Sequence, residues 1–156
     1  MILKDSTKEF LLEFSSIKEL KNFDFISIGL KPLKKENIYL YKSKGYKFLN
    51  YKITPNIYFL IIFQESNCII ELKNIEISEI SSLLKLINIV IKVNISQQQN
   101  NLKTTRYMSL EIIEKKSFLK FMPDDVISKL LNKSLATIAK RFDAKFIQKM
   151  IPTKVN

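Results

Sequence analysis

One arginine is the side chain best placed to hold an anion. Arg106 lies in a stretch that alternates like a strand, on the same parity as Met108 and Leu110, so its guanidinium is expected to point inward. An inward guanidinium in a cavity could hold an anionic headgroup through two parallel hydrogen bonds. The alternative is a structural role, in which Arg106 reaches solvent near a strand end or pairs with a glutamate.

A second region interleaves aromatic and basic side chains, as sheets that bind single-stranded nucleic acid do. Its members are Tyr39, Tyr41, Tyr46, Phe48, Tyr51, Tyr58 and Phe59, with Lys42, Lys44, Lys47 and Lys52. RNA-recognition sheets also need a Gly-rich strand motif, and the chain has only Gly29 and Gly45. Cross-strand aromatic pairing beside a solvated lysine face is therefore the favoured interpretation.

A row of lysines, Lys129, Lys133 and Lys140, is expected on one face of a C-terminal helix. Such a row could lie on an anionic membrane surface or an acidic partner, although it is more often a solvated face. The net charge of +11 favours anionic partners in the same way. Lys greatly outnumbers Arg, however, and Ile and Asn are abundant, which is typical of an AT-rich genome and accounts for part of the charge.

The composition excludes several kinds of chemistry. The chain has no His, and its single Cys68 cannot form an intrachain disulfide, a Cys-rich zinc site or an iron–sulfur site. Cys68 precedes Ile69 and Ile70, so it is interpreted as a small buried apolar residue. The pair Asp124-Asp125 is explained by a helix start. We therefore predict no catalytic residue, no metal site and no cofactor, and expect the protein not to be an enzyme.

The size and hydropathy indicate one domain spanning residues 1–156. With 46% hydrophobic residues, a chain of 156 residues can bury roughly 70% of its unfolded surface. No segment has the roughly 18 consecutive apolar residues of a membrane span, and the N-terminal residues do not resemble a leader peptide. The protein is expected to be soluble or peripherally associated with a membrane.

The periodicity divides the domain into three parts. Residues 1–35 are expected to hold a first strand over 6–14 and a short helix that begins at Ser15-Ser16, with Glu19 in a capping box. Residues 36–121 read as antiparallel strands, including 57–63, apolar on both sides, and 87–95, apolar on one side. A change of parity within 68–77 predicts a bulge near Lys73-Asn74. The polar segment 96–101 is expected to connect two strands, the second over 102–113, and residues 117–121 could complete the sheet.

The third part, residues 123–150, is expected to form one long helix. Pro123 suits the first helical turn, and Pro152 ends the helix. Apolar residues recur at spacings of three or four and define one stripe: Ile127, Leu131, Leu135, Ile138, Phe142 and Phe146. At about 1.5 Å per residue, such a helix is long enough to cross a small sheet.

This order of elements resembles the helix-grip (START-like) fold, in which a curved antiparallel sheet wraps a C-terminal helix. The motifs GYKFLNYKITPNIYFLIIF, NCIIELKNIEI and DVISKLLNKSLATIAKRF further resemble an uncharacterised domain family of cyanobacteria and plastids, over roughly Glu36 to Phe142. The family usually has Gly in the last helix, where this chain has Asn132-Lys133-Ser134. The resemblance implies a plastid (chloroplast) setting, agrees with the AT-rich composition and transfers no catalytic residues.

These observations predict an α+β helix-grip domain that acts as a plastid accessory or binding protein. A hydrophobic small molecule, such as a lipid or pigment, is expected between the sheet and the helix. The residues expected to line its cavity are Phe59, Ile61, Ile89, Ile91, Arg106, Met108, Leu110, Leu131, Leu135, Ile138 and Phe142. The alternative is a structural protein that binds partners and assists assembly of a photosynthetic or other plastid complex. Nucleic-acid binding is a third, less favoured option.

Overall fold

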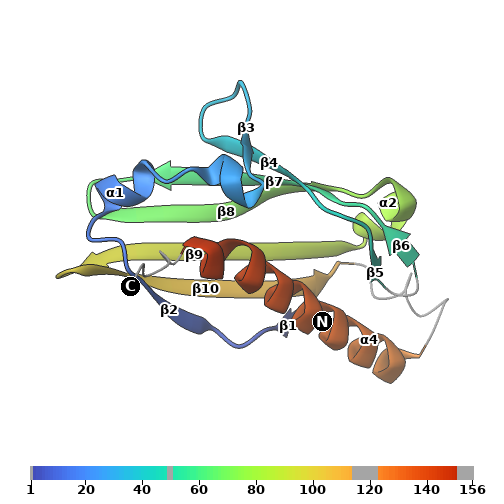
Figure 1. Cartoon of the computed structure of the whole chain (residues 1–156). Coiled ribbons are helices and arrows are strands. Elements are labelled where there is room, and N and C mark those ends of the chain that lie inside the picture. Colours follow the sequence, from blue (N-terminus) through green and yellow to red (C-terminus); the bar gives the residue numbers. More distant parts are fainter. Residues whose placement is uncertain (1, 49–50, 114–122, 151–156) are drawn as a thin grey trace.

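A computed structural model describes residues 2–48, 51–113 and 123–150, which form an α+β fold of one antiparallel sheet and a long C-terminal helix (Figure 1). The eight-stranded sheet has the order β1-β10-β9-β8-β7-β4-β3, with β2 also paired to β10. Its strands are β1 (Ile2–Lys4), β2 (Lys8–Leu12), β3 (Lys31–Pro32), β4 (Ile38–Lys42), β7 (Asn56–Phe63), β8 (Asn67–Glu76), β9 (Ile87–Gln98) and β10 (Asn101–Ile112). Strands β5 (Tyr46–Phe48) and β6 (Tyr51–Ile53) form a separate hairpin.

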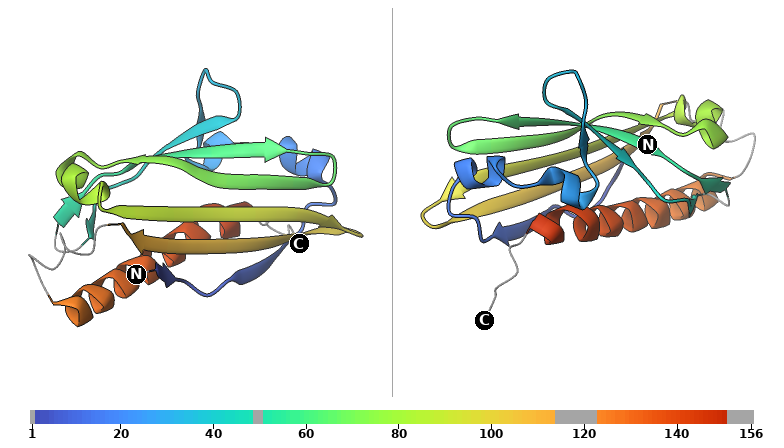
Figure 2. Two further views of the ribbon diagram at one scale, coloured as in Figure 1. Left: turned by 180° about the vertical axis from the view of Figure 1, so that it is seen from behind. Right: turned by 45° about the horizontal axis from the view of Figure 1, so that its top comes forward.

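The remaining elements are helical. They are α1 (Ile17–Lys21), η1 (Phe25–Ile28), η2 (Ser78–Ile80), α2 (Ser81–Leu84), α4 (Asp124–Phe142), η3 (Asp143–Ile147) and η4 (Gln148–Met150). Helix α4 lies across one face of the sheet, and α1 and η1 lie over the same face beside β7 and β8 (Figure 1). Seen from behind, the long strands form the opposite face of the molecule, and α4 lies beyond them (Figure 2).

The edge of the sheet at β10 is made by the N-terminal segment in two pieces. Strand β2 pairs with residues 102–106 of β10, and β1 pairs with residues 109–111. Between them, the amide of Asp5 donates to the carbonyl of Met108 at 3.1 Å. The first strand was expected over 6–14, so it is shorter than expected, and β1 was missed. The break at residues 5–7 brings Asp5 and Ser6 against the inner face of β10.

The two longest strands match the sequence patterns closely. In β9, Ile87, Ile91, Val93 and Ile95 are buried while Asn88, Lys92 and Asn94 are exposed, which confirms the one-sided stripe. Strand β10 covers 101–112, as expected. The connection is tighter than expected, however, because the ladder between β9 and β10 runs on to the pair Gln98 and Asn101.

The bulge in β8 is confirmed. The register between β7 and β8 changes from Tyr58 opposite Asn74 to Phe59 opposite Leu72, so Lys73 is the extra residue. Strand β7 was expected to be covered on both sides. Phe59 and Ile61 are fully buried, but Leu60 and Ile62 on its other side are only half-buried. The covering is therefore complete on the inner side alone.

The short N-terminal helix begins where the serines predict. Ser16 is the N-cap of α1, and its hydroxyl accepts from the amide of Glu19 at 3.2 Å. The carboxylate of Glu19 in turn accepts from the amide and the hydroxyl of Ser15, at 2.8 and 2.6 Å. These bonds to Ser15 lower the pKa of Glu19. The capping box therefore fixes where the chain leaves β2.

The C-terminal helix runs as expected to Met150, but its geometry changes at Asp143. Pro123 is the N-cap rather than a residue of the first turn, and its ψ of 153° is extended. Residues 143–147 form a π-helical turn. From Ala139 onward two adjacent columns are buried, one of Ala139, Asp143 and Ile147 and the other of Phe142, Phe146 and Met150. The side chain of Ile127, expected in the stripe, lies outside the described side chains.

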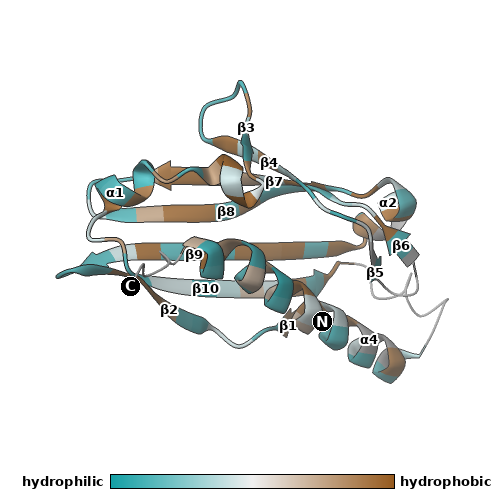
Figure 3. Cartoon of the chain, in the orientation of Figure 1, coloured by the Kyte–Doolittle hydropathy of each residue, from teal (hydrophilic) through white to brown (hydrophobic). Residues whose placement is uncertain are grey.

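The core fills the space between the sheet and the helices. Apolar residues dominate the central strands β7, β8 and β9, whereas α4 carries polar residues on its outward side (Figure 3). The helix end packs on the sheet through rings: Phe59 of β7 lies 5.8 Å from Phe142 and 5.4 Å from Phe146, and Tyr41 of β4 lies 4.9 Å from Phe146. Aromatic contacts thus fix the end of α4 over β4 and β7.

Candidate ligand-binding cleft

Arg106 points inward, as its parity predicts, but the protein itself supplies its partners. Its Nε and Nη2 donate to the two carboxylate oxygens of Asp143 at 2.9 and 2.8 Å. Its Nη1 donates to Asp5 Oδ2 at 2.7 Å and to the carbonyl of Ser6 at 3.3 Å. Arg106 is fully buried and Asp143 is 4% exposed. The cluster therefore joins the break between β1 and β2, the strand β10 and the π-turn after α4.

The cluster keeps the guanidinium charged. Burial alone lowers the pKa of Arg106, but the hydrogen bonds and charges of Asp143 and Asp5 outweigh burial and raise the pKa above its usual value. Every side-chain nitrogen of Arg106 already donates to a protein acceptor. Its geometry matches the structural alternative, with aspartates in place of the expected glutamate.

An open cleft lies elsewhere, between β4, β7 and the end of the C-terminal helix. Its volume is about 390 Å³, within the range of about 300–1,000 Å³ typical of small-molecule sites. Its apolar lining comes from both the sheet and the helix: Ile28, Tyr41, Ile57, Phe59, Ile91, Ile138, Phe142 and Phe146. Gly29, which also lines the cleft, ends η1 with a φ of +91°, and a Cβ there would lie 3.1 Å from the Tyr41 ring, so the backbone can approach this ring only without a side chain.

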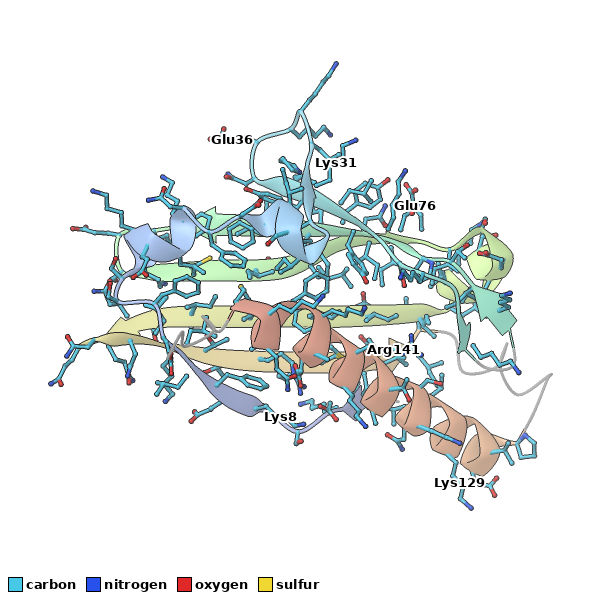
Figure 4. The ribbon with its side chains drawn as sticks, in the orientation of Figure 1. Lys8, Lys31, Glu36, Glu76, Lys129 and Arg141 are labelled. Carbon is cyan, nitrogen blue, oxygen red and sulfur yellow. The ribbon has the colours of Figure 1, made fainter. Side chains whose placement is uncertain are left out.

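Basic side chains border this apolar lining on two sides. Lys42 and Lys44 come from the end of β4 and the residues after it, and Arg141, Lys145 and Lys149 come from the C-terminal helix. None of the described residues that line the cleft is acidic. In Figure 4, Lys129 projects from the ribbon near the start of α4, whereas Arg141 lies further along the helix, close to the end of α4. We call Lys42, Lys44, Lys145 and Lys149 the lysine rim.

A small apolar void lies beside the cleft. This void has a volume of about 30 Å³ and is bordered by β6, β8, β9 and α2. Ile57, Ile91 and Ile138 line both spaces, and the void adds Ile53, Pro55, Ile75, Ile77, Ile80, Leu84, Ile87 and Ile89. The cleft with its lysine rim and the void among isoleucines are therefore neighbouring spaces that share three side chains.

The predicted lining residues divide between these spaces and the solid core. Phe59, Ile91, Ile138 and Phe142 line the cleft, and Ile89 lines the void. The others line neither space and are fully packed; they are Ile61, Arg106, Met108, Leu110, Leu131 and Leu135. The helix stripe thus has two roles, since Leu131 and Leu135 meet side chains while Ile138 and Phe142 face a cavity.

Neither the lysine rim nor the acids around Arg106 were predicted from the sequence. The rim was hidden because lysine is abundant along the whole chain. Asp143 carried a usable signal: it continues the column of Leu131, Leu135 and Ala139 at a spacing of four. An acid in phase with apolar residues of a helix indicates a buried carboxylate, which requires a cation as partner.

The interleaved aromatic region does not form one stacking surface among its described side chains. Tyr39 contacts Phe25 at 5.9 Å and Tyr41 contacts Phe146, so both rings pack inward. Tyr58, on the other face, donates to Glu76 at 3.3 Å. Burial and the charge of Glu76 raise the pKa of Tyr58. Cross-strand and core packing therefore account for these rings, in line with the favoured interpretation.

The remaining candidate positions are structural or exposed. Cys68 is fully buried, and burial raises the pKa of its thiol to about 12, which confirms it as an apolar core residue. Lys129, Lys133 and Lys140 are exposed on α4. A hollow of about 400 Å³ lies between β8 and β9 beyond their last paired residues, and its lining mixes apolar side chains with charges of both signs, including the Glu71–Lys92 pair at 3.7 Å. Among the described residues, no three His, Cys, Asp or Glu lie close enough to hold a metal ion.

Comparison with protein-family models, curated proteins and solved structures finds no match to this chain. The resemblance to a plastid domain family therefore stays a prediction. The fold and site define an α+β protein with a sheet, a covering C-terminal helix and a basic-rimmed cleft between them. Within the described ranges, none of the helices has the length and apolarity needed to cross a membrane.

Proposed function

We propose that this chain is a non-enzymatic binding protein of plastids that holds a hydrophobic small molecule between its sheet and its C-terminal helix. The observation that carries the proposal is the cleft lined by Phe59, Ile138 and Phe142, which is open to solvent and adjacent to a small apolar void. Concave, mostly apolar spaces with a few polar groups at the opening are the usual form of small-molecule sites. The plastid setting is supported by the sequence resemblance and the AT-rich composition.

The fold we propose for this role is the START-like helix grip. Three features support it: the first strands pair with the last strand, every neighbouring pair in the main sheet is antiparallel, and the chain then enters a long helix over one face. In such an arrangement the helix forms one wall of a cavity whose floor is the sheet. Ring contacts at 4.9–5.8 Å hold the helix end in place beside the cleft.

The first test fills the cleft. Ile138 is half-buried and lines both spaces, so Ile138→Trp should block them, and it gives a chain without native Trp a single fluorescent reporter. We expect the affinity for Nile red, a neutral apolar dye, to fall at least tenfold. The control is Val126→Trp, which adds the same side chain at a position of α4 that is 41% exposed and should leave dye binding unchanged.

The second test examines the natural protein. Native mass spectrometry after purification from its own organelle should detect a bound small molecule that denaturation releases. A protein mass without ligand, together with equal dye binding by both Trp variants, would contradict the proposal. Recovery of a stable protein complex with no small molecule would instead favour the partner-binding role.

A further inference from the structure

The lysine rim carries positive charge only. Four lysines from two separate elements converge on one opening, with Arg141 on the same side of the helix. Among described residues, none of the salt bridges engages Lys42, Lys44, Lys145 or Lys149. Two lysines outside the cleft lining do pair with acids, Lys103 with Glu9 at 3.2 Å and Lys92 with Glu71 at 3.7 Å. The rim therefore concentrates positive charge that none of the described acids neutralises in a salt bridge.

The spacing along the helix explains how the rim forms. Lys145 and Lys149 follow Arg141 at intervals of four, so they lie along one side of the helical segment. Phe142 and Phe146 are each one position further on and face the sheet. The same helical segment thus offers an aromatic wall to the cleft and a cationic border to its opening.

The interior of the cleft, in contrast to its rim, is apolar. Away from the lysines the lining is aliphatic and aromatic, and Ile57, Ile91 and Ile138 lie between the cleft and the neighbouring void. Arg106, the buried cation, is already engaged by Asp143 and Asp5 and lines neither space. An anionic group is therefore favoured at the opening, and an apolar chain is favoured inside.

We propose that the ligand is an amphiphilic anion, with a carboxylate or phosphate headgroup at the lysine rim and an aliphatic chain directed toward the isoleucines of the void. This inference rests on the proposed binding function and specifies its ligand class. Lysine ammonium groups donate charge-assisted hydrogen bonds to carboxylate or phosphate oxygens, and burial of the chain supplies the non-directional part of the affinity.

The test compares ligands that differ in one part each, below their micelle concentrations. Dodecanoate and dodecyl phosphate carry both the chain and the charge, dodecanol carries only the chain, and inorganic phosphate carries only the charge. We expect both anionic amphiphiles to displace Nile red at concentrations at least tenfold lower than dodecanol requires. Inorganic phosphate should leave the dye bound. The ratio between the two amphiphiles distinguishes a fatty-acid-like ligand from a phospholipid-like one.

Two matched triple variants test whether the lysine rim is responsible for the preference for anionic ligands. The triple variant Lys42→Gln, Lys145→Gln and Lys149→Gln should weaken dodecanoate binding by about tenfold to a hundredfold, as loss of charged hydrogen bonds does. Dodecanol binding should stay within twofold. The control triple Lys129→Gln, Lys133→Gln and Lys140→Gln removes the same charge from exposed positions of α4 away from the cleft and should change neither.

The possible failures are distinguishable. If dodecanol binds as tightly as dodecanoate and the rim variant changes nothing, the inference is overturned while the proposed function stands. If inorganic phosphate binds as well as the amphiphiles, the rim is a simple anion site and the inference is again overturned. If no chain-bearing compound binds, the proposed function itself fails. Thermal melts of both triple variants verify that they are folded.

Discussion

Arg106 on β10 and Asp143 after α4 meet through two parallel hydrogen bonds of 2.9 and 2.8 Å, in a place where neither side chain reaches solvent appreciably. This pair gives the long helix a polar anchor at its C-terminal end, beside the ring contacts made by Phe142 and Phe146. Asp5, in the N-terminal segment, accepts a third side-chain hydrogen bond from Arg106. Removing one of these side chains should therefore lower the stability of the fold strongly, because a buried charge would be left without its partner.

We predict that Asp143→Ala lowers the free energy of unfolding by about 3–5 kcal/mol, the usual cost of breaking a buried ion pair. Urea denaturation followed by circular dichroism measures this value. The control is Lys103→Ala, which breaks the exposed Lys103–Glu9 pair between β10 and β2 and should cost less than about 1 kcal/mol. The double variant Arg106→Met with Asp143→Leu should be milder than Asp143→Ala. Equal costs for Asp143→Ala and Lys103→Ala would refute the anchoring role.

Replacing Thr104 is expected to change stability in the opposite direction. Its hydroxyl is fully buried and has no hydrogen-bond partner, two positions from Arg106 on the inner face of β10. A buried unpaired hydroxyl is destabilising, and valine has nearly the same shape. We expect Thr104→Val to leave stability unchanged or raise it by up to about 1–3 kcal/mol, as measured by the urea midpoint. A clear loss of stability would instead reveal a polar contact of Thr104 in solution.

The thiol of Cys68 should make stability fall at alkaline pH. Burial raises its pKa from an ordinary value near 9 to about 12, so between these values the folded state keeps a proton that the unfolded state has lost. Stability then decreases as pH rises, with a slope of at most about 1.4 kcal/mol per pH unit for one group. Unfolding of the wild type and of Cys68→Val between pH 8 and 11 isolates this contribution from that of the lysines. Parallel curves for the two proteins would contradict it.

The same burial predicts slow alkylation. At pH 8.5, iodoacetamide should modify native Cys68 only as fast as the chain opens, because the thiolate is the reactive form and the site is closed. Mass spectrometry with and without urea measures both rates. Rapid modification of the native protein would show that β7 and β8 separate readily.

Residues of the helix stripe that pack in the core and residues that line the cleft should differ in how much they stabilise the fold. Leu135 is 2% exposed and meets only side chains, so Leu135→Ala should cost about 2–5 kcal/mol. Ile138 is half-buried at the cleft, so Ile138→Ala should cost about 1 kcal/mol because less apolar surface is lost from packing. Chemical denaturation compares them directly. A cost for Ile138→Ala as large as that for Leu135→Ala would place Ile138 in the solid core.

Local patterns predicted the elements that carry their own periodicity. The stripe of β9, the bulge at Lys73 and the long C-terminal helix each follow from neighbouring residues, and the structure confirms them. Strand β1 was missed because three residues are too few to establish an alternation. Its position depends on β10, whose partner residues lie about a hundred positions away, and no local pattern encodes that distance.

The cleft was predictable only in part for the same reason. Phe59, Ile91, Ile138 and Phe142 were expected to face a cavity because their parity and helical spacing place them inward. The rim depends on Lys42 meeting Lys145 and Lys149, which requires the actual path of α4 across β4. Arg106 was correctly placed inward, yet its acids are separated from it by 101 and 37 residues. Whether an inward arginine meets a ligand or a carboxylate is decided by the tertiary fold.

The interrupted edge strand has a consequence for how the chain is made. Strands β1 and β2 have no place in the sheet until β10 leaves the ribosome, and Arg106 has no full set of partners until Asp143 follows. Residues 2–12 must therefore wait until residues 101–112 and Asp143 have been synthesised. Such long loop closure slows folding and leaves the apolar faces of the early strands exposed meanwhile. A chaperone that shields nascent chains should accordingly increase the yield of this protein more than it increases its final stability.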